Sequence, residues 1–173
     1  VKEVFYSLQG EGFHSGRPAL FCRMSKCNLW SGREQDRADA VCPFCDTDFI
    51  GTDGQNGGRF ADADALSRHL LQFWPQNSTQ TPFVVLTGGE PLLQVDQALI
   101  DALHHYHFEV AVETNGTKRA PQGIDWICVS PKGKTKVVQR SGNELKLVWP
   151  QPGVDPDALS GWDFDHFLIQ PMD

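Results

Sequence analysis

Three of the five cysteines are spaced like metal ligands. Cys27, Cys42 and Cys45 form the pattern C-x14-C-x2-C, in which the last two thiols can chelate from one tight loop. Cys22 and Cys128 lie in apolar runs, where a thiol is more often an inert core residue. Because no nearby histidine has the spacing of a fourth ligand, the three thiols favour an iron–sulfur cluster with one iron open to a ligand. A zinc site completed by Cys22 or Cys128, and a Cys-x-x-Cys redox pair, remain open alternatives.

Small or polar residues follow four apolar runs directly. They are Thr87-Gly88-Gly89-Glu90-Pro91, Glu113-Thr114-Asn115-Gly116, Ser130-Pro131-Lys132 and Gln170-Pro171-Met172-Asp173. In parallel sheets and barrels, ligands bind at the carboxyl ends of the strands. Any one of these segments could be an ordinary turn, since Gly, Pro and Asn favour turns. Four in succession favour one shared site.

The strands and helices that position these residues are predicted to alternate along the chain. Short, continuous apolar runs are typical of strands buried on both faces of a parallel sheet; they are Ala19–Met24, Phe83–Leu86, Phe108–Val112, Trp126–Val129, Leu145–Val148 and Phe167–Ile169. A helix is predicted from an N-cap at Asp62 or Asp64 to about Trp74, and a second from about Val95 to Tyr106. The crossovers Lys118–Gly123 and Lys134–Gly142 are too short for full helices. We therefore expect an α/β fold with right-handed crossovers.

Size and charge exclude several classes of function. At about 100–200 residues per domain, 173 residues make one domain. The 15 Lys and Arg residues are scattered in a chain of net charge −7, which argues against binding to nucleic acid or an anionic membrane. No run approaches about 18 apolar residues, so no membrane span is expected. An odd number of cysteines without a secretion signal predicts a cytoplasmic protein.

The Gly88-Gly89-Glu90 turn and the three cysteines resemble the radical S-adenosylmethionine (SAM) superfamily. The resemblance narrows to the 7-carboxy-7-deazaguanine synthases through Leu8-Gln9-Gly10-Glu11-Gly12, Phe21-Cys22-Arg23, Cys45-Asp46-Thr47 and the last three strand-end segments above. It spans essentially the whole chain. Two departures stand out. The spacing between the first two cysteines is longer than the usual motif, so Asn28–Val41 is read as an insertion that some members share. Family members also continue beyond the position of Asp173, which predicts a truncated C-terminal end.

The resemblance implies a single radical SAM core domain over residues 1–173. Its fold would be a partial (β/α)6 barrel with abbreviated crossovers and the active site at the carboxyl edge of the strands. Cys27, Cys42 and Cys45 would hold a 4Fe–4S cluster with SAM on its fourth iron. The implied reaction converts 6-carboxy-5,6,7,8-tetrahydropterin to 7-carboxy-7-deazaguanine with loss of ammonia, in queuosine biosynthesis. The implied partners are an electron donor such as flavodoxin and a second copy in a homodimer.

Site residues carry over from the resemblance position by position. The SAM-binding set is Phe44, Cys45, Asp46, Gly89, Glu90, Ser130, Pro131, Lys132, Gln170, Pro171, Met172 and Asp173. The substrate-binding set is Leu8, Gln9, Gly10, Arg23 and Thr87. Thr47 would ligate a Mg²⁺ shared with the substrate.

Two other functions stay open at this point. One is another radical SAM enzyme, such as an activase that makes a glycyl radical on a partner protein; Leu8–Gly12 and Thr47 argue against it. The other is a non-catalytic module stapled by zinc, which metal analysis separates from an iron–sulfur protein.

Overall fold

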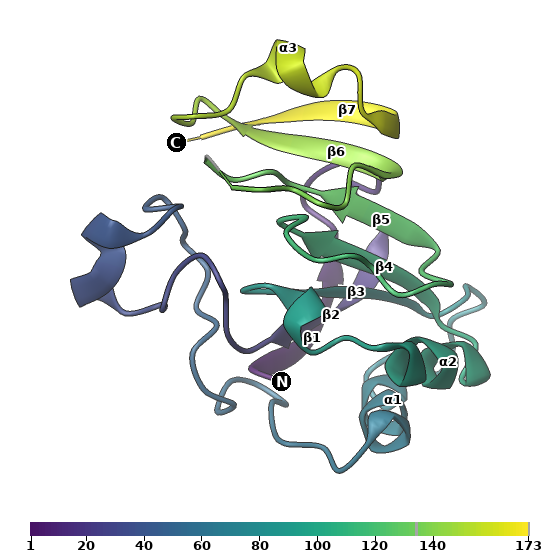
Figure 1. The fold of residues 1–173 in the computed structure, drawn as a ribbon. Helices are drawn as coiled ribbons and strands as arrows, with labels where there is room; N and C mark the ends of the chain where they lie inside the picture. Colours follow the sequence, from purple (N-terminus) through teal and green to yellow (C-terminus); the bar gives the residue numbers. More distant parts are fainter. Residues whose placement is uncertain (134, 173) are drawn as a thin grey trace.

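One sheet organises the described part of the chain. The computed structural model describes residues 1–133 and 135–172, and within them seven strands lie side by side in sequence order (Figure 1). The strands are β1 (Glu3–Leu8), β2 (Pro18–Met24), β3 (Phe83–Gly88), β4 (Glu109–Thr114), β5 (Trp126–Val129), β6 (Ser141–Trp149) and β7 (Asp163–Pro171). β1 pairs antiparallel with β2, and each later pair is parallel. The α/β prediction is confirmed.

The first strand is absent from the sequence prediction. β1 has the burial of a strand at the edge of a sheet: Val4 is fully buried, whereas Tyr6 and Leu8 are 44% and 60% exposed. A strand of this kind has no continuous apolar run to identify it. Its hairpin with β2 brings residues 9–17 back toward the sheet.

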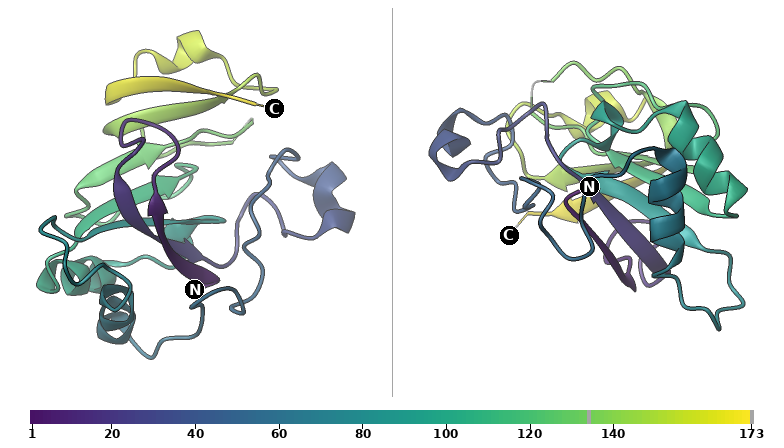
Figure 2. Two further views of the ribbon diagram at one scale, coloured as in Figure 1. Left: turned by 180° about the vertical axis from the view of Figure 1, so that it is seen from behind. Right: turned by 90° about the horizontal axis from the view of Figure 1, so that it is seen from below.

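Two helices cover one side of the sheet. α1 (Ala63–Leu71) is N-capped by Asp62, whose carboxylate accepts from Ala65 N at 2.8 Å, and α2 (Gln97–His105) is capped in the same way by Asp96. Figure 2 shows both helices together on the side away from the loop that holds the 3-10 helix η1 (Glu34–Asp39). The crossovers from β4 to β5 and from β5 to β6 contain no helix in the described residues, as predicted. α1 ends three residues before the predicted Trp74.

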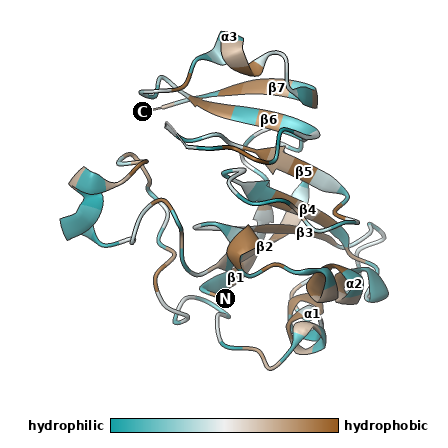
Figure 3. Cartoon of the chain, in the orientation of Figure 1, coloured by the Kyte–Doolittle hydropathy of each residue, from teal (hydrophilic) through white to brown (hydrophobic). Residues whose placement is uncertain are grey.

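The main core lies between these helices and the central strands. Ile100 and Leu103 of α2 are fully buried, as are Val84 and Leu86 of β3 and Leu70 of α1. A smaller cluster joins Leu145 and Leu147 of β6 to Leu159 of the short helix α3 (Pro156–Leu159). Figure 3 shows hydrophobic residues along the central strands, whereas η1 is hydrophilic. No helix within the described residues is both long enough and apolar enough to cross a membrane.

Replacing Ile100 with alanine tests this core. Because the side chain is fully buried against the sheet, Ile100→Ala should lower the free energy of unfolding by about 2–5 kcal/mol. Leu93, which is 38% exposed, supplies the control Leu93→Ala. Urea denaturation followed by circular dichroism measures both, and equal losses in the two variants would contradict the assigned core.

Candidate active site

A cavity of about 650 Å³ lies at the carboxyl edge of the parallel strands. Many of the residues expected at the site line it: Cys27, Cys42, Phe44, Cys45, Asp46, Thr47, Thr87, Gly89, Ser130, Lys132, Gln170, Pro171 and Met172. They come from the segments after β2, β3 and β5 and from the end of β7. The parallel register therefore brings together residues that are far apart in sequence, as the strand-end pattern predicts.

The other expected residues lie elsewhere among the described residues or outside them. Leu8, Gln9, Gly10, Arg23, Glu90 and Pro131 are not among the residues that line this cavity, and Asp173 lies outside the described residues. Arg23 is paired in register with Thr87, so it shares a sheet face with a lining residue. Its Nε donates to Glu3 Oε1 at 2.7 Å, and its Nη groups have no hydrogen-bond partner among the described residues.

The three spaced thiols reach the same cavity. Cys27 follows β2, and Cys42 and Cys45 lie on one turn in which Cys45 N donates to Cys42 O at 3.2 Å. Burial raises the pKa of Cys27 and raises that of Cys42 to about 11. Within residues 1–133 and 135–172, no group of three or more His, Cys, Asp or Glu side chains converges closely enough to hold a single metal ion. Three soft thiol donors around one large cavity are a donor set that fits an iron–sulfur cluster.

The other two cysteines lie away from that cavity. Cys22 is fully buried in the main core, where burial raises its pKa to about 12. Cys128 is 3% exposed and borders a second cavity of about 10 Å³, which shares Glu11 and Glu113 with the large cavity. Neither thiol lines the large cavity that the three spaced cysteines share.

The Gly88-Gly89-Glu90 turn is packed tightly against the segment after β2. Gly88 has φ +125°, and a Cβ there would lie 2.2 Å from Met24 O. A Cβ on Gly89 would lie 2.2 Å from Lys26 O and 2.9 Å from Cys27 Cβ. The protein's own backbone thus requires glycine at both positions. The resemblance places Gly89 against SAM, and this backbone packing is an additional reason for a glycine at that position.

Glu90 connects the ends of two strands. Its carboxylate is fully buried and accepts from Leu92 N at 2.9 Å, Thr114 Oγ1 at 2.7 Å and Asn115 N at 2.8 Å. Burial raises the pKa of Glu90, while these three donors oppose the shift. Both oxygens are therefore engaged by the protein. The contact with a SAM ammonium expected from the resemblance remains a prediction.

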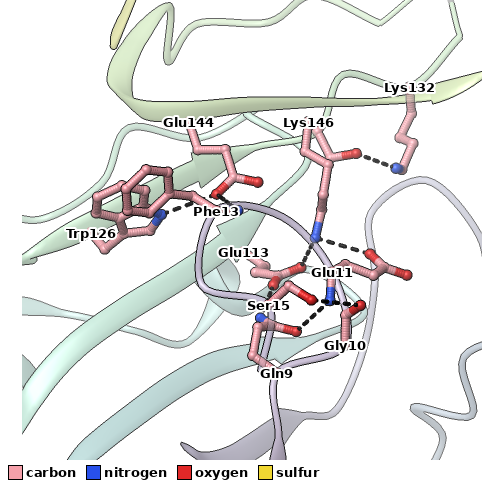
Figure 4. Close-up of polar contacts among 11 residues, drawn as sticks. Gln9, Gly10, Glu11, Phe13, Ser15, Glu113, Trp126, Lys132, Glu144 and Lys146 are labelled. Carbon is pink, nitrogen blue, oxygen red and sulfur yellow. Dashed lines mark hydrogen bonds and ion pairs between the residues drawn. The ribbon is translucent and has the colours of Figure 1, made fainter. Parts of the chain in front are cut away.

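Lys146 is a buried cation that no motif identified. Its side chain is 5% exposed, and Nζ donates to Glu113 Oε2 at 2.9 Å and lies 3.0 Å from Glu11 Oε2 (Figure 4). Gln9 Nε2 donates to Glu113 Oε1 at 2.8 Å, so the hairpin loop after β1 is tied to β4 and β6. Burial disfavours the charge on Lys146, but Glu113 and Glu11 outweigh that penalty and raise its pKa. Lys146, Glu113 and Glu11 all line the large cavity.

Glu144 of β6 makes a second polar contact with the loop after β1. Glu144 Oε2 accepts from Phe13 N at 3.2 Å and from Trp126 Nε1 at 3.3 Å. Phe13 stacks on Trp126 and on His166, with ring centroids 5.0 Å and 4.2 Å away. The loop after β1 is thus tied to β4 and β6 through Gln9 and Glu11, and to β5 and β6 through Phe13.

Comparison with known proteins decides the family. No protein-family model matches the chain. The chain is 60% identical over 173 residues to the 7-carboxy-7-deazaguanine synthase of Bradyrhizobium diazoefficiens, a match that covers 100% of this chain and 82% of that protein. It is 58% identical to the synthase of Bordetella pertussis with the same coverage. The chain belongs to the 7-carboxy-7-deazaguanine synthase family.

A solved structure agrees with this assignment. The crystal structure of QueE from Escherichia coli aligns with a TM-score of 0.63 at 26% identity, covering 87% of this chain and 71% of that one. The family recognition from the motifs is confirmed, and the chain is an enzyme of the synthase family. The activase and the zinc-stapled module find no support among these relatives.

The sequence of β6 contains a sign of the buried Lys146 contacts that the family motifs do not include. In Asn143–Val148, the charged residues Glu144 and Lys146 alternate with Leu145 and Leu147. Alternation on a strand sends both charges to one face, and here it is the face on which Lys146 contacts Glu113. Two charged side chains on one face of a largely buried strand need polar partners there, so this alternation indicates buried ion pairs.

Removing the charge of Lys146 tests this network. Lys146→Met should lower the free energy of unfolding of the metal-free protein by about 2–3 kcal/mol, because Glu113 loses its buried counter-ion. This loss is smaller than for a fully enclosed pair, since the Glu11 side chain is 48% exposed. Lys136→Met, at an exposed lysine, is the matched control in urea denaturation. A variant as stable as this control would show that Lys146 contributes no net stability.

Proposed function

We propose that the large cavity is the active site and that Cys27, Cys42 and Cys45 hold a 4Fe–4S cluster in it. The chain is a radical SAM lyase of queuosine biosynthesis, as its family membership shows. The single observation that carries the ligand assignment is that these three thiols line one cavity with the Gly89 turn and Ser130, whereas Cys22 and Cys128 do not. When bound, the cluster supplies the electron for reductive cleavage of SAM, which starts the rearrangement of 6-carboxy-5,6,7,8-tetrahydropterin to 7-carboxy-7-deazaguanine with loss of ammonia.

The residues of this chain would bind and orient the two ligands. Ser130 and Lys132 lie together after β5, with Lys132 Nζ 2.6 Å from Ser130 Oγ; with residues 170–172 they would border the adenosine. Burial lowers the pKa of Lys132, which makes it a poorly hydrated cation that gains from an anionic or polar ligand. Phe44, Cys45 and Asp46 would line the SAM side of the cluster turn, and Gly89 and Glu90 would approach the methionine part of SAM.

The substrate would lie between the β1–β2 loop and the ends of β2, β3 and β4. The Nη groups of Arg23 are suited to the substrate carboxylate, since guanidinium and carboxylate form paired hydrogen bonds. Thr87, on the same sheet face, adds a hydroxyl. Glu113 and Glu11 border the cavity and can accept from N–H groups of the pterin ring. Leu8, Gln9 and Gly10 would complete the substrate side of the site.

The finer points of the fold and assembly are also part of this proposal. Six parallel strands, β2 to β7, in sequence order support a partial (β/α)6 barrel forming one radical SAM core domain. An electron donor such as flavodoxin, a homodimer and a cytoplasmic location remain predictions.

Counting iron in cysteine variants tests the ligand assignment. After anaerobic reconstitution, Cys27→Ser, Cys42→Ser and Cys45→Ser should each lose most of the iron and acid-labile sulfide, because serine is a poor ligand for a cluster iron. Cys22→Ser serves as the control and should retain both, provided that circular dichroism shows a folded protein. Equal iron loss in Cys22→Ser and Cys42→Ser would contradict the assignment of three ligands.

Thr47 is the proposed protein ligand of a Mg²⁺ ion. It lines the cavity and lies two residues after Cys45, the last residue of the Cys42–Cys45 turn. Mg²⁺ prefers oxygen donors and keeps several waters, so one hydroxyl binds it weakly until the substrate carboxylate is present. Thr47→Ala should raise the KM and weaken the response of the initial rate to added Mg²⁺, whereas Thr47→Ser should keep most of it. An unchanged Mg²⁺ dependence in Thr47→Ala would rule out this ligand.

A further inference from the structure

The insertion between Cys27 and Cys42 has no role that the sequence identifies. In the structure, residues 28–41 contain η1 and project away from the sheet (Figure 1). η1 buries none of its residues, so it adds nothing to the hydrophobic core. It nevertheless reaches the turn that holds two of the three spaced thiols.

The contact is made by Arg37. Its Nη1 donates to the carbonyl oxygens of Pro43 at 2.7 Å and Cys45 at 2.9 Å. Pro43 lies between the two cysteines of the turn and Cys45 is one of them. One guanidinium nitrogen therefore holds both carbonyls.

The rest of the guanidinium group is held in place. Nε and Nη2 each lie 2.8 Å from Glu34 Oε2, and the guanidinium carbon lies 4.4 Å from the centroid of the Trp30 ring. Trp30 is 7% exposed and packs edge-on against Phe49 at 5.7 Å. Arg37 thus has a carboxylate on one edge, an aromatic ring on its face and the turn on its other edge. Such an arrangement uses the planar fork of arginine, which lysine lacks.

We propose that Arg37 is a positioning residue that fixes the Cys42–Cys45 turn from outside the cavity. In a trans peptide, the carbonyl and the following N–H point in opposite directions. Holding the Pro43 and Cys45 carbonyls toward Arg37 therefore turns the N–H groups of Phe44 and Asp46 away from it. Phe44, Cys45 and Asp46 line the cavity and Arg37 does not. The insertion is thus the device that orders the turn before any cofactor binds.

The charge of Arg37 is balanced by Glu34, so the proposed effect is geometric. Ordering the turn in advance removes part of the entropy cost of assembling a cluster on it. This role rests on the proposed cluster ligands, whereas the order of the turn itself does not.

Hydrogen exchange of the metal-free protein tests the order of the turn. Arg37→Gln should speed exchange of the Cys45 amide, which donates to Cys42 O at 3.2 Å, about tenfold, which corresponds to about 1.4 kcal/mol, and leave β2–β5 unchanged. Arg37→Lys keeps the charge and should give nearly the same increase. The matched control is Arg33→Gln, an exposed arginine just before η1. Exchange in Arg37→Gln equal to that in the control, or full rescue by lysine, would overturn the proposal.

Iron release tests the link to the cofactor. From the reconstituted protein, a chelator should remove iron about tenfold faster in Arg37→Gln than in Arg33→Gln. Faster exchange of the turn with unchanged iron release would contradict a positioning role for the cluster thiols. If the unsubstituted protein takes up no iron, the proposed cluster is wrong, and the exchange measurement still decides whether Arg37 holds the turn.

Discussion

Parallel pairing of the strands is the constraint on which the site depends. β2 to β7 run in the same direction in sequence order, so each strand delivers the residues that follow it to one edge of the sheet. The cysteines after β2, the glycine turn after β3, Ser130 after β5 and the end of β7 meet at a single cavity for this reason. The direction and order of the strands thus gather the site residues at one edge of the sheet. The crossovers mainly carry the chain back to the opposite edge, where the next strand begins.

The edge is rigid because buried polar groups connect its segments. The fully buried carboxylate of Glu90 binds donors from the turn after β4, and Lys146 of β6 joins Glu113 to the loop after β1. Each group is costly to bury unless its partners are in place. These ties favour one arrangement of the strand ends over others, which suits an enzyme whose ligands carry the reactive chemistry while the protein supplies placement.

The sequence predicts the central strands of the sheet well and the strands toward its two edges less well. β2 to β5 are identified by short apolar runs because both faces of those strands are buried. β1 leaves no such run because its outer residues are exposed. Only Leu145–Val148 of β6 is found, because the first residues of that strand, Ser141–Glu144, are small or polar. The three thiols are recognisable from spacing, and the comparisons confirm the family to which the motifs point. The contacts of Arg37 and Lys146 are not recognisable, because they depend on which distant residues the fold brings beside them.

In the proposed active site, the cluster, SAM and the substrate meet in the cavity at the carboxyl edge of the strands. A crystal structure of the anaerobically reconstituted protein with SAM and 6-carboxy-5,6,7,8-tetrahydropterin tests this arrangement most directly. We expect a cluster bound by Cys27, Cys42 and Cys45 and SAM against Gly89 and Ser130, with the pterin beside Thr87 and Glu113. A cluster ligated by Cys22 or Cys128, or SAM bound outside this cavity, would contradict it.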